Sequence, residues 1–213
     1  PVGHYLRLAD GTHLAYDRLL LATGSSAVRP TLPGVDLPQV VTLDNLADAE
    51  RILALARKAH SAVVVGGGIT ALEIVEGLRE HCRRVHYLLR GERYWNNVLD
   101  DAEARIVIQR LAAEGVRIHT NTEIAAIEGQ RGRVAAVLTA DGRRIACDMV
   151  AVAIGVAPRA QLARSAGLHV DRGVVVDEAL RSSAPDIYAA GDVAQVYDAR
   201  AGKALLDTLW NTA

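Results

Sequence analysis

The chain has 213 residues, of which 50% are hydrophobic, and its formal net charge is −1. This composition supplies enough apolar side chains for one large or two small globular domains. The basic residues do not gather into one run, so bulk electrostatics favours neither a nucleic acid nor a membrane surface as partner. Small molecules are the expected partners.

The cysteines and the hydrophobic segments argue against a metal site and a membrane span. Cys82 and Cys147 lie far apart, and neither has a second cysteine or a histidine at metal-ligand spacing. We therefore expect two inert thiols and no metal site. The sequence has no signal peptide and no apolar run of the roughly 18 residues that a membrane span needs, which predicts a cytoplasmic protein.

The first part of the chain reads as a hairpin followed by a connector. Residues Tyr5–Leu21 alternate in hydrophobicity and predict a hairpin across Asp10-Gly11, followed by a strand over Arg18–Ala22. Three prolines in Ser25–Pro38 exclude a regular helix or a central strand there. This segment suits a crossing between domains.

Strands and helices then alternate. A helix is predicted over Ala47–Ala59, with Asp44 or Asn45 as its N-cap. The following elements are, in order, a strand Ser61–Val65, a helix ending at Arg79, a strand Val85–Leu89, a helix from Asp100 or Asp101 to Glu114, and a strand Val116–His119. This order predicts an α/β fold with a right-handed, doubly wound parallel sheet of the Rossmann type.

The remaining segments predict further strands. A small antiparallel meander is expected from Glu123–Glu128, Arg133–Leu138 and Arg144–Cys147, after which Met149–Ala153 returns to the parallel sheet. Beyond Gly155 we expect a short helix at Leu162–Ala166 and strands at Val174–Asp177 and Asp186–Ala190.

A sequence repeat organises these elements. The pattern of Ala9–Gly24 returns in Ala140–Gly155, each with an Asp-Gly turn, a further aspartate, and an apolar run that ends in a glycine. Two related domains are therefore predicted. A strand, a glycine-rich turn and a helix precede the second copy, whereas only eight residues precede the first. We expect the sequence to begin inside a domain.

The glycine-rich turn carries a G-x-G-x-x-A pattern between a strand and a helix. Gly66 allows a tight turn, Gly68 lets backbone amides approach a pyrophosphate, and Ala71 lets the helix pack closely on the strand. The positive end of the helix would face the phosphates. The alternative is a strand-to-helix turn without a ligand. The residues expected to bind a dinucleotide here are Gly66, Gly67, Gly68, Ile69, Thr70 and Ala71.

The type of nicotinamide dinucleotide should depend on the residue about 20 positions after this turn, where an acid would bind the 2′-hydroxyl of NAD. That position is Leu89, and Arg90 and Arg93 follow it. The two arginines could bind the 2′-phosphate of NADP instead. Glu92 could serve a ribose hydroxyl in a longer turn, so NADP is favoured over NAD but NAD remains the alternative.

Four segments together resemble the FAD-dependent pyridine nucleotide-disulfide oxidoreductase superfamily. They are Ala22-Thr23-Gly24-Ser25, Gly66–Glu73, Ala153-Ile154-Gly155 and Tyr188-Ala189-Ala190-Gly191-Asp192. The chain looks closer to the rubredoxin, ferredoxin and nitrite reductase flavoproteins than to the disulfide reductases.

The resemblance implies a FAD-binding domain that is interrupted by an NAD(P)H domain of the same type. The implied division is 1–44 and 158–213 for the partial FAD domain and 45–157 for the NAD(P)H domain. Thr23 and Gly24 match a turn near FAD, and Gly191 and Asp192 match the site of its ribityl and pyrophosphate part.

Two further residues acquire expected roles from the resemblance. Glu73 matches a glutamate near the nicotinamide and flavin, where it would be a positioning group, and Gly155 matches the strand end where the nicotinamide lies.

The chain also departs from the family pattern. The FAD-binding glycine turn and any redox cysteine pair would lie before Pro1. Where the family often has a basic residue the chain has Val28, with Arg29 one step later, and Trp210–Ala213 resembles the start of a helix leading to an interface domain.

The implied function is that of a flavoprotein oxidoreductase. The parent enzyme would transfer a hydride from NAD(P)H to FAD and pass electrons to a protein or small-molecule acceptor, and it would form a homodimer. We expect this chain alone to bind NAD(P)H and to have little activity. The alternative is a module that binds or senses a nucleotide without chemistry.

Overall fold

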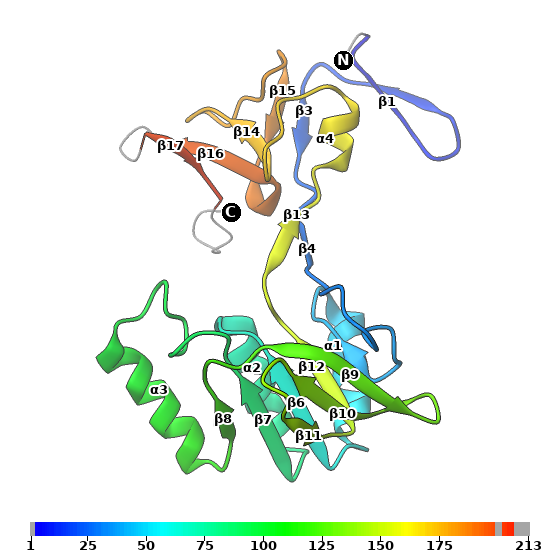
Figure 1. Ribbon diagram of the computed structural model, residues 1–213. Coiled ribbons are helices and arrows are strands. Elements are labelled where there is room, and N and C mark those ends of the chain that lie inside the picture. Colours follow the sequence, from blue (N-terminus) through cyan, green and yellow to red (C-terminus); the bar gives the residue numbers. More distant parts are fainter. Residues whose placement is uncertain (1–2, 199–201, 207–213) are drawn as a thin grey trace. The chain divides into compact units, whose positions relative to one another are not determined.

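The computed structural model describes residues 3–198 and 202–206, and the chain divides into two compact units (Figure 1). The central unit is Ala27–Gly155, and the split unit combines Pro1–Ser26 with Val156–Ala213. The divisions thus fall at residues 26 and 155, whereas the sequence placed them at 44 and 157. The connector belongs to the central unit because it packs there, as described below.

The central unit is built on a five-stranded parallel sheet. In spatial order its strands are β5 (Val40–Val41), β12 (Met149–Val152), β6 (Ser61–Val65), β7 (Arg84–Leu88) and β8 (Arg117–His119). The predicted α/β fold with a parallel sheet is confirmed. β5 was not predicted, because it has only two residues and directly follows the proline-rich connector.

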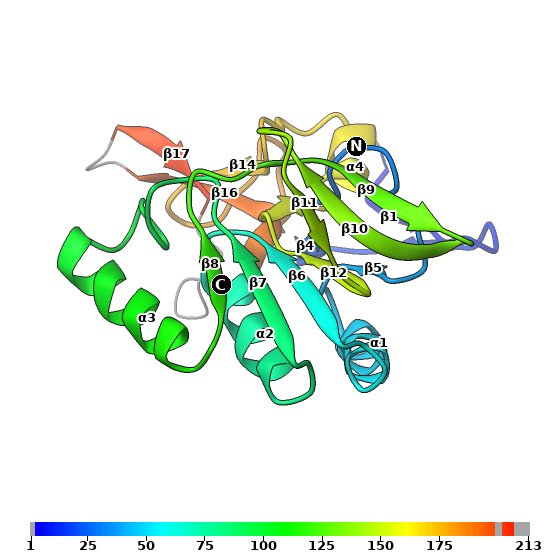
Figure 2. The ribbon, with the colours of Figure 1, turned by 60° about the horizontal axis from the view of Figure 1, so that its bottom comes forward.

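Helices cover one face of this sheet and an antiparallel meander covers the other (Figure 2). The helices are α1 (Leu46–Ala56), α2 (Ile69–Arg79) and α3 (Asp101–Ala113), and the meander consists of β9 (Ile124–Gln130), β10 (Arg133–Thr139) and β11 (Arg144–Ala146). Ala62 and Val64 of β6 belong to the core on the helix side, while Val63 and Val65 belong to the core beneath the meander. A strand whose residues alternate between two cores reads as one continuous apolar run, as predicted.

Local sequence sets the helix ends. The side chain of Asn45 accepts a hydrogen bond from the Asp48 amide and caps α1, so Asn45 rather than Asp44 is the N-cap. The helix ends at Ala56, three residues before the predicted end. Asp100 and Glu103 form a capping box at the start of α3, since each side chain accepts from the other residue's amide.

The connector packs on the meander and does not stand apart from it. The carbonyl of Pro33 accepts a 2.8 Å hydrogen bond from the Ile127 amide of β9. At Gly34 φ is +82°, and a Cβ atom would lie 1.9 Å from the Ile127 carbonyl oxygen. Glycine is therefore required there, and the connector lies directly on β9.

The split unit contains smaller sheets. These are the hairpin β1 (Tyr5–Arg7) with β2 (His13–Ala15), the parallel pair β3 (Leu19–Leu21) with β15 (Ile187–Ala189), and β14 (Val174–Val176) with β16 (Ala194–Asp198) and β17 (Lys203–Leu205). The short helix is α4 (Gln161–Ser165). β16 and β17 were not predicted, and the segment Trp210–Ala213 lies outside the described residues.

Two short strands lie where the chain passes between the units. β4 (Ser25–Ala27) and β13 (Val156–Pro158) form a two-stranded sheet. Within the described ranges, no helix is long and apolar enough to cross a membrane. The same residues hold no group of three or more His, Cys, Asp or Glu side chains arranged for a metal ion.

Candidate dinucleotide sites

The glycine-rich turn joins the end of β6 to the start of α2. Gly66 has a φ of +151°, and a Cβ atom there would lie 2.1 Å from the carbonyl oxygen of Ala153 and 3.1 Å from the Cβ of Ala71. Ala71 is fully buried. The predicted steric reasons for glycine at 66 and a small residue at 71 are therefore seen in the structure.

The other side of the turn is open. A Cβ atom at Gly67 or Gly68 would meet nothing within 4 Å, and no side-chain hydrogen bond caps α2 at Gly68. Gly67, Ile69 and Thr70 are exposed. The first amides of an uncapped helix are free to bind an anion, and the positive end of the helix dipole favours one. Glu73, one turn further along α2, is also exposed.

The segment after β7 carries the residues that were expected to select NADP. Leu89 is fully buried in the helix-side core, so it offers no polar group to a ribose. The Arg90 side chain is 86% exposed and lies 3.8 Å from the Glu123 carboxylate. Arg93 is engaged elsewhere, because its guanidinium pairs with Asp101.

Further hydrogen bonds tie the loops at this edge of the sheet together. The guanidinium of Arg93 also donates to the Asn96 carbonyl, at 3.2 Å. The amide of Trp95 donates to the Gly67 carbonyl, at 2.9 Å. The Asn121 amide, after β8, donates to the Gly91 carbonyl, at 3.0 Å. Sequence reasoning missed the contact of Trp95 with the glycine turn, since a backbone hydrogen bond between distant loops has no signature in the residue types.

Gly155 lies just past the end of β12, with a φ of +121°. Its carbonyl accepts a 2.9 Å hydrogen bond from the Val28 amide, and a Cβ atom there would meet nothing within 4 Å. The predicted residues of the central unit thus occur on one connected framework, in which β6 and β12 are adjacent parallel strands.

A second group of predicted residues meets in the split unit. The hydroxyl of Ser25 donates a 2.5 Å hydrogen bond to the carboxylate of Asp192, and the Thr23 hydroxyl donates to the Arg159 carbonyl at 2.8 Å. Gly191 has a φ of +71° and open space where a Cβ atom would lie. Gly24 has a φ of +66°, and its nearest neighbour there is an Arg159 nitrogen at 4.0 Å.

Arg159 was not among the predicted residues. Its guanidinium donates to the Ser26 hydroxyl, at 2.7 Å, and its amide donates to the Gly24 carbonyl, at 2.9 Å. Arg159 thus braces the Ala-Thr-Gly-Ser turn from both its main chain and its side chain. The sequence did not predict this role, because Arg159 is far from the turn along the chain.

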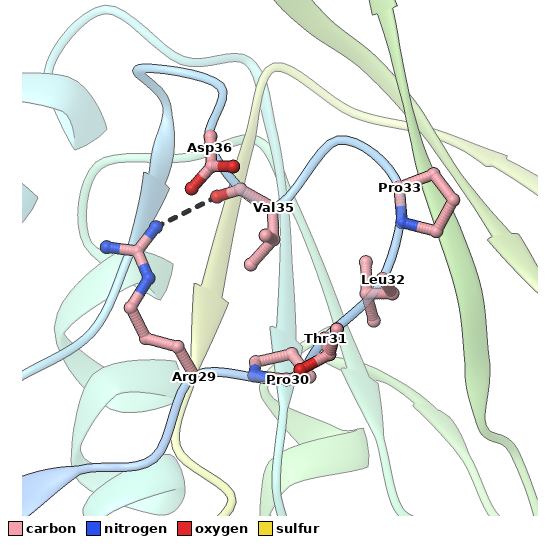
Figure 3. Close-up of a pocket in the computed structure, with 7 residues that line it drawn as sticks. All are labelled: Arg29, Pro30, Thr31, Leu32, Pro33, Val35 and Asp36. Atoms are coloured by element: carbon pink, nitrogen blue, oxygen red, sulfur yellow. Dashed lines mark hydrogen bonds between the residues drawn. The ribbon is translucent and has the colours of Figure 1, made fainter.

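A hollow of about 540 Å³ lies in the connector of the central unit (Figure 3). It is lined by Arg29, Pro30, Thr31, Leu32, Pro33, Val35 and Asp36. The Arg29 guanidinium donates to the Val35 carbonyl at 2.9 Å and so spans the loop. None of the predicted dinucleotide-binding residues lines this hollow, and the arginine has a structural partner.

Cys82 and Cys147 are free thiols, and both are buried. Burial raises the pKa of Cys82 to about 11 and the pKa of Cys147 to about 12. Because the thiolate is the reactive form, neither side chain is a nucleophile near neutral pH.

Comparison with known proteins now adds to this geometry. The sequence profile of the pyridine nucleotide-disulphide oxidoreductase family matches residues 3–207. The chain belongs to this family. A curated relative, the biphenyl dioxygenase system ferredoxin–NAD(+) reductase component of Paraburkholderia xenovorans, is 39% identical over 207 residues, covering 97% of this chain and 50% of the relative. The rubredoxin–NAD(+) reductase of Pseudomonas putida is 38% identical, over 87% of this chain and 48% of the relative.

Solved structures of family members have the same fold. The ferredoxin reductase for the CYP199A2 system from Rhodopseudomonas palustris superimposes with a TM-score of 0.93 at 30% identity, covering 96% of this chain and 51% of that one. A covalent putidaredoxin reductase–putidaredoxin complex gives a TM-score of 0.92 at 30% identity, over 98% and 51%. The chain spans about half the length of these relatives.

Proposed function

We propose that the central unit binds NADH or NADPH and that the split unit contributes part of a FAD site, within an enzyme that passes electrons from the nicotinamide to a small redox protein. The observation that carries the proposal is the glycine turn that begins at Gly66, in a chain of this family. At Gly66 the turn packs tightly against the Ala153 carbonyl, whereas the space around Gly67 and Gly68 is open. The relatives are named as ferredoxin and rubredoxin reductases, which supports a redox protein as the acceptor.

The residues of the split unit fit a flavin dinucleotide. Gly24 and Gly191 leave open the space that a Cβ atom would fill, and the Asp192 carboxylate is an acceptor for ligand hydroxyl groups. Ser25 and Arg159 fix the carboxylate and the turn before any ligand arrives. When bound, FAD would accept a hydride from the nicotinamide and release electrons singly, whereas the chain's own residues bind and orient.

In the central unit the main chain does most of the binding. The exposed amides at the start of α2 would hold the pyrophosphate, and Gly155 would leave room at the end of β12 for the nicotinamide. Glu73 is on the exposed face of α2 and would help to position the nicotinamide. A homodimeric parent enzyme and a cytoplasmic location stay predictions of the sequence alone.

A substitution at Gly68 tests the binding site without disturbing the fold. Gly68 has a φ of −111° and open space at its Cβ position, so alanine fits there, but the new methyl group would lie where the pyrophosphate approaches. We expect Gly68→Ala to keep its melting temperature and to bind NADH and NADPH about tenfold or more weakly. Gly77→Ala, on an open site within α2, is the matched control. If Gly68→Ala binds both nucleotides as wild type does, the site is not at this turn.

The choice between the two nucleotides is a narrower part of the proposal. The relatives are named for NAD(+), which does not support a preference for NADP. Arg93 is already paired with Asp101, so any discrimination by charge depends on Arg90. Isothermal titration should show that Arg90→Ala weakens NADPH binding about tenfold and NADH binding little, and that Arg93→Ala does not separate the two. Equal losses for both nucleotides in Arg90→Ala would exclude this role.

A further inference from the structure

Trp95 adopts a backbone conformation that bulky residues rarely accept. Its φ is +47°, in the left-handed region where a side chain crowds the following carbonyl. Such outliers persist only where the surroundings enforce them, and they gather at functional sites. The residue lies in the loop after β7, next to the glycine turn.

Several contacts hold Trp95 in this conformation. Its carbonyl accepts 2.9 Å hydrogen bonds from the amides of Val98 and Leu99, and its indole packs against the helix-side core. Its neighbour Tyr94 is 2% exposed, and its ring lies 6.1 Å from that of Trp95. Burial raises the pKa of Tyr94, and the charges of Glu73 and Glu76 on α2 raise it further. The aromatic pair therefore anchors this loop beside α2.

The loop that Trp95 and Tyr94 anchor is hydrogen-bonded to the glycine turn. The Trp95 amide donates to the carbonyl of Gly67, and that carbonyl belongs to the same peptide plane as the amide of Gly68. The described residues contain no cis peptide bond, so the carbonyl and the amide of this plane point in opposite directions. A carbonyl fixed towards Trp95 thus fixes the Gly68 N–H away from it. Because glycine accepts many backbone conformations, the plane between Gly67 and Gly68 would have more freedom to rotate without this bond.

We propose that Trp95 is a positioning residue for pyrophosphate binding, acting through the Gly67–Gly68 peptide plane. Its left-handed backbone conformation directs its amide to the Gly67 carbonyl and thereby presents the Gly68 amide to a phosphate oxygen. This role rests on the proposed function, since it requires a dinucleotide at the turn. It predicts that Trp95 affects ligands that carry a pyrophosphate and not adenosine itself.

The test uses two substitutions of similar size in the full chain. Trp95→Leu removes the indole and resists a positive φ, while Trp95→Asn also removes the indole but accepts a positive φ more readily. We expect Trp95→Leu to bind ADP and NADH about tenfold more weakly than wild type, with its affinity for adenosine unchanged. Trp95→Asn should bind ADP and NADH about threefold more tightly than Trp95→Leu does. Affinities come from calorimetry for ADP and NADH and from NMR titration for adenosine.

Arg131→Leu is the matched control. Arg131 also has a positive φ, +54°, but it lies in the turn between β9 and β10, and among the described residues no backbone hydrogen bond joins it to the glycine turn. Its variant should lower the melting temperature without changing the ratio of ADP to adenosine affinity. If Trp95→Leu likewise leaves that ratio unchanged, the positioning role is wrong. If wild type binds neither ADP nor NADH, the proposed function fails and this role fails with it.

Hydrogen exchange in the wild-type protein tests the same role without relying on variants that could fold poorly. Binding and the Trp95–Gly67 hydrogen bond must strengthen each other if they share one peptide plane. With ¹⁵N-tryptophan labelling, ADP should slow hydrogen exchange of the Trp95 amide several-fold, while adenosine should not. Equal exchange rates with and without bound ADP would contradict the proposal.

Discussion

The two copies of the repeated sequence fold alike locally but are supported differently. Each begins with a hairpin across an Asp-Gly turn, in which φ is +88° at Gly11 and +84° at Gly142. The aspartate of each turn has a lowered pKa. The main cause at Asp10 is a hydrogen bond from the Thr12 backbone amide, and the main cause at Asp141 is a hydrogen bond from the Thr139 hydroxyl. Local sequence is therefore enough to specify the turn.

The strands that follow the turns show the difference. In the second copy β12 lies between two parallel neighbours, β5 and β6, and all four of its residues are buried. Among the residues that the structure describes, β3 in the first copy pairs with one parallel neighbour, β15, and Leu20 is 58% exposed. Within these residues the same pattern thus forms a strand with two neighbours in the central unit and a strand with one neighbour in the split unit.

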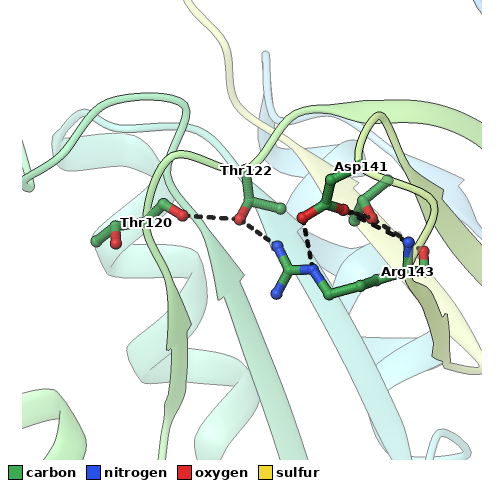
Figure 4. Close-up of polar contacts among 5 residues, drawn as sticks. Thr120, Thr122, Asp141 and Arg143 are labelled. Atoms are coloured by element: carbon green, nitrogen blue, oxygen red, sulfur yellow. Dashed lines mark hydrogen bonds and ion pairs between the residues drawn. The ribbon is translucent and has the colours of Figure 1, made fainter.

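The second turn is also fastened to the rest of its unit (Figure 4). Arg143 donates to Asp141 within the turn, at 2.7 Å, and to the hydroxyl of Thr122 after β8, at 2.9 Å. The Thr122 hydroxyl in turn donates to the Thr120 carbonyl. At the equivalent place in the first turn, the Thr12 amide donates to the Asp10 carboxylate, and among the described residues the turn has no side-chain hydrogen bond to a distant segment. In the part of the chain that the structure describes, this support from a distant segment distinguishes the second turn from the first.

The largest expected effect concerns the glycine turn that lies before the second copy. Gly66→Ala would place a methyl group 2.1 Å from the Ala153 carbonyl, so β12 and β6 would have to separate. We expect a loss of about 4 kcal/mol in the unfolding free energy of the central unit, measured by urea denaturation. Gly68→Ala, in the same turn but with open space, should lose less than about 1 kcal/mol. Similar losses in both variants would show that close packing at Gly66 is unimportant.

Truncating one side chain in each strand compares a buried position of β12 with an exposed position of β3. Met149 in β12 is fully buried, so Met149→Ala should lower the unfolding free energy by about 3 kcal/mol through lost contacts and a cavity. Leu20→Ala in β3 should cost less than about 1 kcal/mol, because that side chain is largely exposed. Thermal and urea unfolding would measure both variants. A comparable loss for Leu20→Ala would mean that β3 is as well supported as β12.

Sequence reasoning succeeded where neighbours along the chain decide the structure. The strand Ser61–Val65 and the end of α2 at Arg79 have the predicted bounds, since a run of apolar residues and a glycine turn are local signals. The cap at Asp100 is also encoded locally. The residues at Gly66 and Ala71 could be assigned because the steric need for small side chains is visible in the residue types.

Several of the missed features depend on distant partners. β5 is a strand only because Val40 and Val41 pair with Val150 and Ala151 of β12. Trp95 touches Gly67, and Arg159 touches the turn at Gly24, through main-chain groups that every residue type possesses. The ion pair of Arg93 with Asp101, eight residues later, was also not predicted, and the role of Arg93 in binding a phosphate stays a prediction.

The aspartates after the two hairpins should contribute unequally. The Asp148 carboxylate accepts hydrogen bonds from the amides of His60, at 2.8 Å, and Ser61, at 2.9 Å, and so joins β12 to the start of β6. Asp148→Ala should cost about 2 kcal/mol, a value reduced because the aspartate is exposed. Asp17→Ala, at the equivalent exposed place in the first copy, should cost less than about 0.5 kcal/mol. Chemical denaturation of the two variants would show whether the difference between copies extends to this position.

The smallest expected effect is a response of the central unit to acid. His86 of β7 and His119 of β8 share a hydrogen bond of 3.0 Å. Burial lowers the pKa of His86 to about 4, helped by the charges of His119, Arg117 and Arg84. Burial also lowers the pKa of His119, and the positive charges of Arg143 and Arg117 lower it further. The negative charge of Asp141 acts in the opposite direction.

Because both folded-state pKa values are lowered, the unfolded chain takes up more protons between about pH 6.5 and pH 4. The stabilisation is complete above pH 6.5 and is lost as the pH falls through this window. We expect the pair to cost about 1 kcal/mol of stability by about pH 6, and more as the pH falls further, since each lowered pKa adds to the loss. His86→Asn should flatten the dependence of the melting temperature on pH, while His13→Asn, on the exposed β2 strand, should not. An unaltered pH profile in His86→Asn would mean that this histidine pair does not couple acid to the stability of the sheet.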